Sequence, residues 1–76
     1  MDISKIFGRI EYVDVFEDYS VRVVEMFADL RVVVVPCLAD APGKWEIVDN
    51  LPDFRIKIVD QEEDFTIEYV TEFPSF

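Results

Sequence analysis

Histidine is absent from this 76-residue chain, and cysteine occurs only once, at Cys37. A nucleophilic thiol or hydroxyl therefore has no imidazole to activate it, and Ser4, Ser20 and Ser75 belong to no recognisable catalytic arrangement. A lone cysteine also excludes an internal disulfide. We predict that the protein is not an enzyme, that it has no catalytic, cofactor-binding or metal-binding residues, and that Cys37 is a small apolar filler.

Basic residues are scarce: seven Lys and Arg stand against seventeen Asp and Glu, for a net charge of −10. This excess of negative charge repels phosphates and argues against direct binding to nucleic acid. The sequence also lacks a basic leader followed by an apolar run, and no apolar stretch approaches the roughly 20 residues that span a bilayer. We therefore predict a soluble, cytoplasmic protein that does not bind membranes.

One pattern of residue types returns every eleven residues. If Asp53 is position zero of a unit, further units begin at residues 7, 18, 29, 42 and 64, and a two-residue insertion near residues 38–41 separates the third unit from the fourth. Position six is valine in every unit, and positions three and five are always apolar or aromatic. An internal repeat of this kind decides the architecture. We predict a single domain, residues 1–76, built from six units.

Apolar residues at positions one, three and five of a unit mostly alternate with polar residues at positions two and four. This period of two, with many β-branched and aromatic residues, predicts a half-buried strand. The expected fold is all-β, with six strand-turn units in a small closed barrel. Connections of about four residues are ordinary in hairpins and favour an antiparallel meander. One alternative stays open, because Tyr19, Val23, Met26 and Leu30 also fit one face of a helix.

The connections carry a second apolar column, at position nine. Its members are Phe16, Phe27, Leu38, Leu51 and Phe73, and only Glu62 interrupts it. Apolar residues in turns suggest that the ends of the barrel are plugged. Residues 1–6 would cap one end as an extended arm or a short helical turn, and residues 75–76 fall in phase with the start of a seventh unit.

Charge follows the repeat as well. Acids occupy position zero in four units (Asp18, Asp29, Asp53, Asp64) and position seven in four units (Asp14, Glu25, Asp49, Asp60), whereas six of the seven basic residues lie at positions two and four. The expected molecule has acidic ends and a waist of mixed charge. We interpret the position-zero aspartates as caps of their own turns. An aspartate in the position-six column, for example at Val59, is expected to destabilise far more than Asp53→Ala.

Four stretches carry a resemblance to a known family. They are residues 28–35, 43–48, 52–59 and 63–70, which read ADLRVVVV, GKWEIV, PDFRIKIV and EDFTIEYV. These units resemble the septoil-knot domain family of small bacterial proteins, which have repeated Ala-Asp-apolar-x-Ile/Val-x-aromatic-Val units and one central glycine-tryptophan variant. The resemblance implies an all-β domain whose backbone is threaded into a knot with seven crossings. It implies no particular biochemical activity.

Three interpretations of function stay open. A compact scaffold or protein-interaction module, as a monomer or a small homo-oligomer, fits the composition best. Alternatively, the acidic surface imitates DNA phosphates and blocks a basic DNA-binding protein. A third possibility is a weak calcium site at Asp60, Glu62, Glu63 and Asp64, although no loop has the spacing of a calcium motif and a structural role for these acids is the simpler interpretation. A basic protein is the partner that the charge favours.

The implied knot gives a first prediction. A knotted chain tightens when it is pulled from its two ends, so it is expected to extend by less than its contour length in single-molecule force spectroscopy. Refolding from the fully unfolded, unknotted chain is expected to be slow. Extension to the full contour length would exclude a knot.

Overall fold

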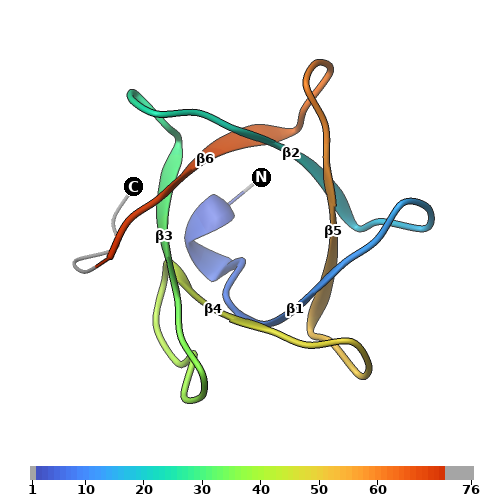
Figure 1. Ribbon diagram of the computed structural model, residues 1–76, viewed down its shortest axis with the longest axis vertical. Helices are drawn as coiled ribbons and strands as arrows, with labels where there is room; N and C mark the ends of the chain where they lie inside the picture. Colours follow the sequence, from blue (N-terminus) through green and yellow to red (C-terminus); the bar gives the residue numbers. More distant parts are fainter. Residues whose placement is uncertain (1, 72–76) are drawn as a thin grey trace.

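The computed structural model describes residues 2–71, and each predicted unit contributes one strand (Figure 1). The strands are β1 (Gly8–Tyr12), β2 (Tyr19–Val23), β3 (Leu30–Val34), β4 (Lys44–Ile47), β5 (Phe54–Ile58) and β6 (Phe65–Tyr69). A short 3-10 turn, η1 (Ile3–Lys5), precedes them. No helix in residues 2–71 is long and apolar enough to cross a membrane. The strand form of Tyr19–Val23 is confirmed, and the helical alternative is wrong.

The six strands close into a barrel in the order β1-β4-β3-β6-β2-β5. All six pairings are parallel, so the antiparallel meander expected from the short connections is wrong. In Figure 1 the strands run around the ring and are strongly inclined to the barrel axis. The end of β1, for example, lies near the beginning of β2, and β5 lies between these two strands in the barrel. A short connection can therefore pass over one neighbour and still join parallel strands, which ordinarily require a much longer crossover.

Strands from the two halves of the chain alternate around the whole barrel. Every strand of residues 8–34 pairs only with strands of residues 44–69, and the reverse also holds. Neither half contains a hydrogen-bonded pair of its own strands. The barrel therefore forms only when both halves are interleaved, and its contacts are mostly distant in sequence.

The position-three column forms the core. Its six members are fully buried: Ile10, Val21, Val32, Trp45, Ile56 and Ile67. Trp45 donates a hydrogen bond from Nε1 to the carbonyl oxygen of Ile6 at 2.9 Å, and Ile6 is itself buried. The short helical turn at residues 3–5 thus covers the end of the barrel at which the strands begin. The core column and the capping role of the first residues agree with the sequence pattern.

The position-six valines are only half-buried, which corrects the expectation for Val59. These residues follow the strand ends, and their amides bond to a neighbouring strand; the Val59 amide, for example, donates to the carbonyl of Val21 at 2.9 Å. Successive side chains of a strand point to opposite faces, so position six faces away from the buried position three. The position-six side chains therefore lie on the outside of the barrel. An aspartate in place of Val59 would keep access to water. The large loss of stability caused by a buried charge is instead expected for an aspartate at position three.

The position-zero aspartates join the two halves of the chain. Each accepts a hydrogen bond from the backbone amide at position two of a neighbouring strand: Asp53 from Arg9 (2.9 Å), Asp64 from Ser20 (2.8 Å), Asp18 from Arg55 (2.8 Å) and Asp29 from Thr66 (3.0 Å). The interpretation as caps of their own turns is therefore wrong, because the partners lie 37 or 44 residues away. We call these four contacts the aspartate clamps.

Gly8 is required by one of these clamps. Its φ is +111°, and a Cβ added there would lie 2.5 Å from Oδ2 of Asp53. Any side chain would clash with the carboxylate and would also be strained in this backbone conformation. The glycine at position one of the first unit thus leaves room for the bond between Asp53 and Arg9.

The burial pattern predicts unequal costs for the same substitution at neighbouring valines. Val21→Ala removes fully buried methyl groups and is expected to lower the free energy of unfolding by about 2 kcal/mol. Val24→Ala, three residues later at position six, should cost less than about half as much because the side chain is only half-buried. Urea unfolding measures both, and equal losses would show that the core register is wrong.

The clamps predict a second contrast within one connection. Asp64→Ala leaves the Ser20 amide without its carboxylate and is expected to cost about 1 to 2 kcal/mol. Asp60→Ala removes the same charge from an exposed position four residues earlier and should change stability by less than about 0.5 kcal/mol. If the two variants unfold at the same urea concentration, the clamp does not contribute to stability.

Candidate functional site

The connections between strands share an unusual backbone conformation at position nine. Phe16, Phe27, Leu38, Leu51 and Glu62 all have a positive φ, between 49° and 60°. These are the position-nine residues of the first five units, and the sixth member, Phe73, lies outside the described residues. The left-handed conformation costs an L-residue with a bulky side chain roughly 1 to 2 kcal/mol, whereas glycine and asparagine adopt it readily. The chain nevertheless places large apolar residues at four of these five positions.

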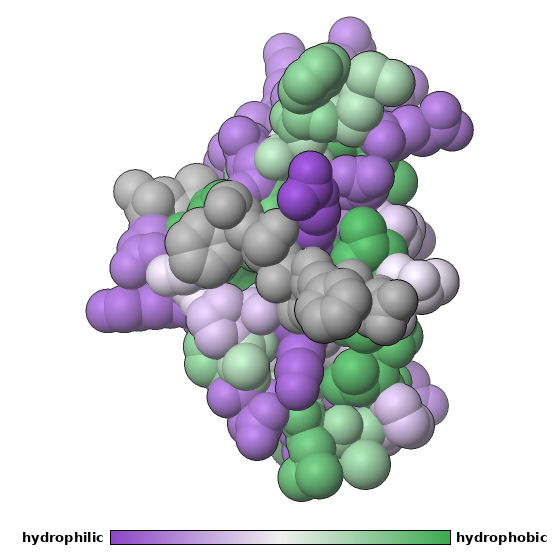
Figure 2. All heavy atoms as spheres, turned by 90° about the vertical axis from the view of Figure 1, so that its left-hand side faces the viewer, coloured by the Kyte–Doolittle hydropathy of each residue, from purple (hydrophilic) through white to green (hydrophobic). Residues whose placement is uncertain are grey.

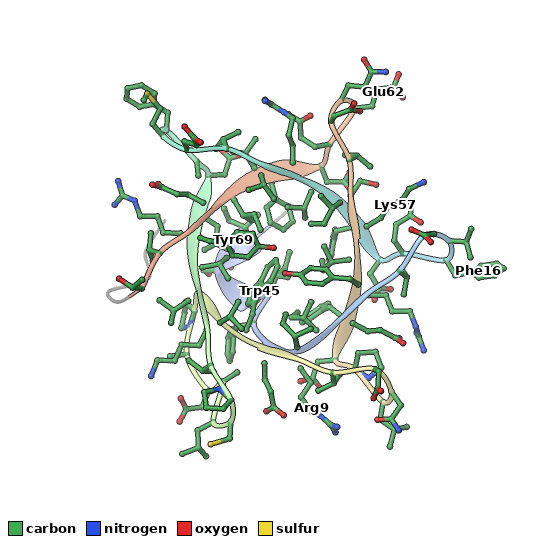
Figure 3. The ribbon with its side chains drawn as sticks, in the orientation of Figure 1. Arg9, Phe16, Trp45, Lys57, Glu62 and Tyr69 are labelled. Atoms are coloured by element: carbon green, nitrogen blue, oxygen red, sulfur yellow. The ribbon has the colours of Figure 1, made fainter. Side chains whose placement is uncertain are left out.

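The apolar position-nine side chains are almost fully exposed. The exposed fraction is 88% for Phe16, 93% for Phe27, 76% for Leu38 and 78% for Leu51. Figure 3 shows Phe16 pointing away from the barrel at the tip of the β1–β2 connection, and Glu62 occupying the tip of the β5–β6 connection. The expectation that this column plugs the ends of the barrel is therefore wrong. We call these four residues the apolar tips.

The connections that carry the apolar tips project outward from the ring (Figure 1). Figure 2 shows apolar atoms on the protruding loops at the top and bottom of one face, with hydrophilic residues around them. Two tips are extended by an exposed apolar neighbour, since Val15 precedes Phe16 and Met26 precedes Phe27. Acids lie on both sides of these two tips, at positions seven and zero. The connections at Phe16 and Phe27 each therefore present a small apolar surface with acidic residues on both sides.

Many acids of the barrel wall and of the strand beginnings have partners within the fold. Besides the aspartate clamps, three carboxylates form ion pairs with arginines across neighbouring strands or the connections that lead into them: Glu63 with Arg22 (3.1 Å), Glu68 with Arg31 (3.4 Å) and Glu11 with Arg55 (3.4 Å). The predicted waist of mixed charge is present in these pairs. A large part of the negative charge therefore serves the pairing of the two halves.

The proposed calcium ligands are used in other ways. Asp64 forms a clamp and Glu63 pairs with Arg22, while Glu62 points outward at a loop tip. Within residues 2–71 no group of three or more acidic, histidine or cysteine residues is arranged to hold a metal ion. The geometry gives the calcium interpretation no support.

Cys37 and the aromatic residues divide between surface and core. Cys37 is exposed, so its interpretation as an apolar filler is wrong. Trp45, at position three, is fully buried, whereas Tyr12 and Tyr69, at position five, are 37% and 44% exposed. Their hydroxyl oxygens lie 2.6 Å apart. Burial, together with the hydrogen bond to Tyr69, raises the pKa of Tyr12 above that of an ordinary tyrosine.

The apolar tips were visible in the sequence as a column, but their exposure was not. The signal that could have revealed it is the acid at position seven and again at position zero, on both sides of position nine in the first two units. If a position-nine side chain were buried in the end of the barrel, the acids two residues before and after it would also be drawn away from water. Removing charged groups from water costs free energy.

Comparison with known protein families identifies a match over nearly the whole chain. The model of the 7(1) septoil knot domain family matches residues 3–76, which is nearly the whole chain. No curated protein matches the sequence. The match covers all six strands and agrees with the all-β barrel and with the units quoted above. The chain therefore belongs to the septoil knot domain family.

Proposed function

We propose that the protein is a non-enzymatic interaction module, a rigid barrel that presents apolar tips to a basic protein partner. The observation that supports this most is the combination of strain and exposure at position nine. A bulky residue with positive φ costs free energy, and an exposed side chain recovers none of it through burial. Strain of this kind is a reason to look for function, and exposed apolar groups are common in protein interfaces.

The charge around the tips supports a basic partner. Phe16 lies between Asp14 and Asp18, and Phe27 lies between Glu25 and Asp29. A partner pocket that receives the ring and carries lysine or arginine at its edge would gain both apolar burial and favourable electrostatics. Acidic phospholipid surfaces would be repelled by the same carboxylates.

The alternative of a DNA-mimicking inhibitor has less support. A mimic of phosphates requires carboxylates that are free to face a basic groove. Here the position-zero aspartates bind backbone amides, and three glutamates pair with arginines. Apolar tips are also not a feature of the DNA backbone.

A double variant at two tips tests the proposal. Phe16→Asn/Phe27→Asn replaces the exposed rings with a residue that tolerates positive φ, so stability should stay the same or rise by up to about 1 kcal/mol. Binding should be lost in a pull-down from lysate read by mass spectrometry. Glu62→Gln, a polar substitution at the equivalent tip, is the control and should retain the partner.

Two results would contradict the proposal. A large loss of stability in the double variant would show that the rings are packed and not displayed. Recovery of the same partner by the double variant and the wild type would show that the tips are not the binding surface. If that partner is a DNA-binding protein that moderate salt releases, the mimicry interpretation replaces the proposal.

A further inference from the structure

The two ends of the barrel differ. At the end where the strands begin, η1 and the buried side chain of Ile6 cover the core. At the other end lie the position-five residues, since parallel strands all finish on the same side. Their exposed fractions range from 37% to 50%: Tyr12, Val23, Val34, Ile47, Ile58 and Tyr69. We call this ring of six the apolar mouth.

The apolar mouth lies directly above the buried column. Side chains at positions three and five share one face of each strand, so the mouth residues point to the same side as the core. Figure 3 shows the side chains of Trp45 and Tyr69 inside the ring. The hydroxyl contact between Tyr12 and Tyr69 joins the first and last strands across the mouth. A hollow of about 160 Å³ adjoins it, lined by Tyr12, Val13, Asp14 and Ile58.

The rim of the mouth is acidic and carries no basic residue. Position seven follows each mouth residue by two and is Asp14, Glu25, Asp49 and Asp60 in four units. All four side chains are exposed, and none forms an ion pair within residues 2–71. No unit has lysine or arginine at positions five to seven. These carboxylates differ in this respect from the aspartate clamps at the opposite end.

We propose that the apolar mouth binds a short segment of a partner protein in which one apolar side chain is flanked by lysine or arginine. The apolar side chain would cover the exposed ring, and the cationic groups would meet the four rim carboxylates. In the hollow, a cation would lie against the face of Tyr12 and beside the carboxylate of Asp14. A second copy of this chain fits less well, because two facing mouths would oppose four acids with four acids. The apolar residues of the mouth differ from those of the apolar tips, although Asp14 and Glu25 adjoin both surfaces.

The test uses the full chain and a defined probe, the peptide acetyl-Lys-Arg-Leu-Arg-Lys-amide. In a ¹⁵N NMR titration the peptide should cause saturable shifts in the amides of residues 12–14, 23–25, 47–49 and 58–60. The equally charged peptide with glycine in place of leucine should bind at least about tenfold more weakly, because the apolar contact is lost. The tip variant Phe16→Asn/Phe27→Asn should bind the leucine peptide like the wild type, so failure of one proposal is distinguishable from failure of the other.

Charge variants complete the test. Asp14→Asn/Asp60→Asn should weaken binding of the leucine peptide by about tenfold at low salt. The control Asp40→Asn/Glu62→Gln removes two charges away from the mouth and should stay within about twofold of the wild type. Equal binding of the leucine and glycine peptides, shifts confined to the loop tips, or no saturable shifts at millimolar peptide would each overturn the proposal. A concentration-dependent dimer that shifts the mouth amides without peptide would overturn it in favour of self-association.

Discussion

The alternation of strands from the two halves of the chain is the constraint on which the rest of the structure depends. Every ladder joins a strand of residues 8–34 to a strand of residues 44–69. No strand of either half has a hydrogen-bonded neighbour until the other half is in place. The core column obeys the same constraint, since three of its members come from each half. Contacts so distant in sequence carry a large loop-closure cost before they stabilise the chain, which favours slow, cooperative folding.

The polar contacts reinforce this interleaving. The aspartate clamps and the arginine–glutamate pairs all connect residues from opposite halves. Exposed ion pairs contribute little each, so their value lies in fixing which strands are neighbours and in which register. The clamps place carboxylates at the beginnings of the strands, and Gly8 makes room for one of them. At the other end of the barrel, the four rim acids form no ion pair within residues 2–71.

A closed barrel of short parallel strands has no free edge, which removes the usual route to strand-to-strand association. The outer surface of the barrel can then carry groups that bind a partner. Within residues 2–71, the large exposed apolar residues lie at the apolar tips, beside them at Val15 and Met26, and in the apolar mouth. Acids flank Phe16 and Phe27 on both sides and follow four of the mouth residues, so the partner that we propose for either surface is basic. The tips tolerate strained backbones because the barrel holds the two ends of each connection in place.

The sequence by itself determined the six strands, their boundaries to within a residue or two and the face of each strand that carries positions one, three and five. This was possible because alternation is a local property: one strand's residues report which of them face a core. In the unit from Phe54 to Val59, alternation places Phe54, Ile56 and Ile58 on one face, and only the structure shows that Ile56 is fully buried whereas Ile58 is exposed. The repeat with its short connections also predicted a closed barrel. Residues 75–76, which are in phase with a seventh unit, lie outside the described residues.

Only the tertiary structure decided the direction of pairing, the strand order and the exposure of the connections. A connection of a few residues has the same composition whether it turns back to a neighbour or passes over one, so its length misled us toward hairpins. Phe16 and Phe27 are as apolar as Phe65, but Phe65 is buried and they are exposed. The difference arises because burial depends on what the rest of the chain places against a residue. Likewise, Asp53 contacts Arg9 only because the fold brings the two halves together.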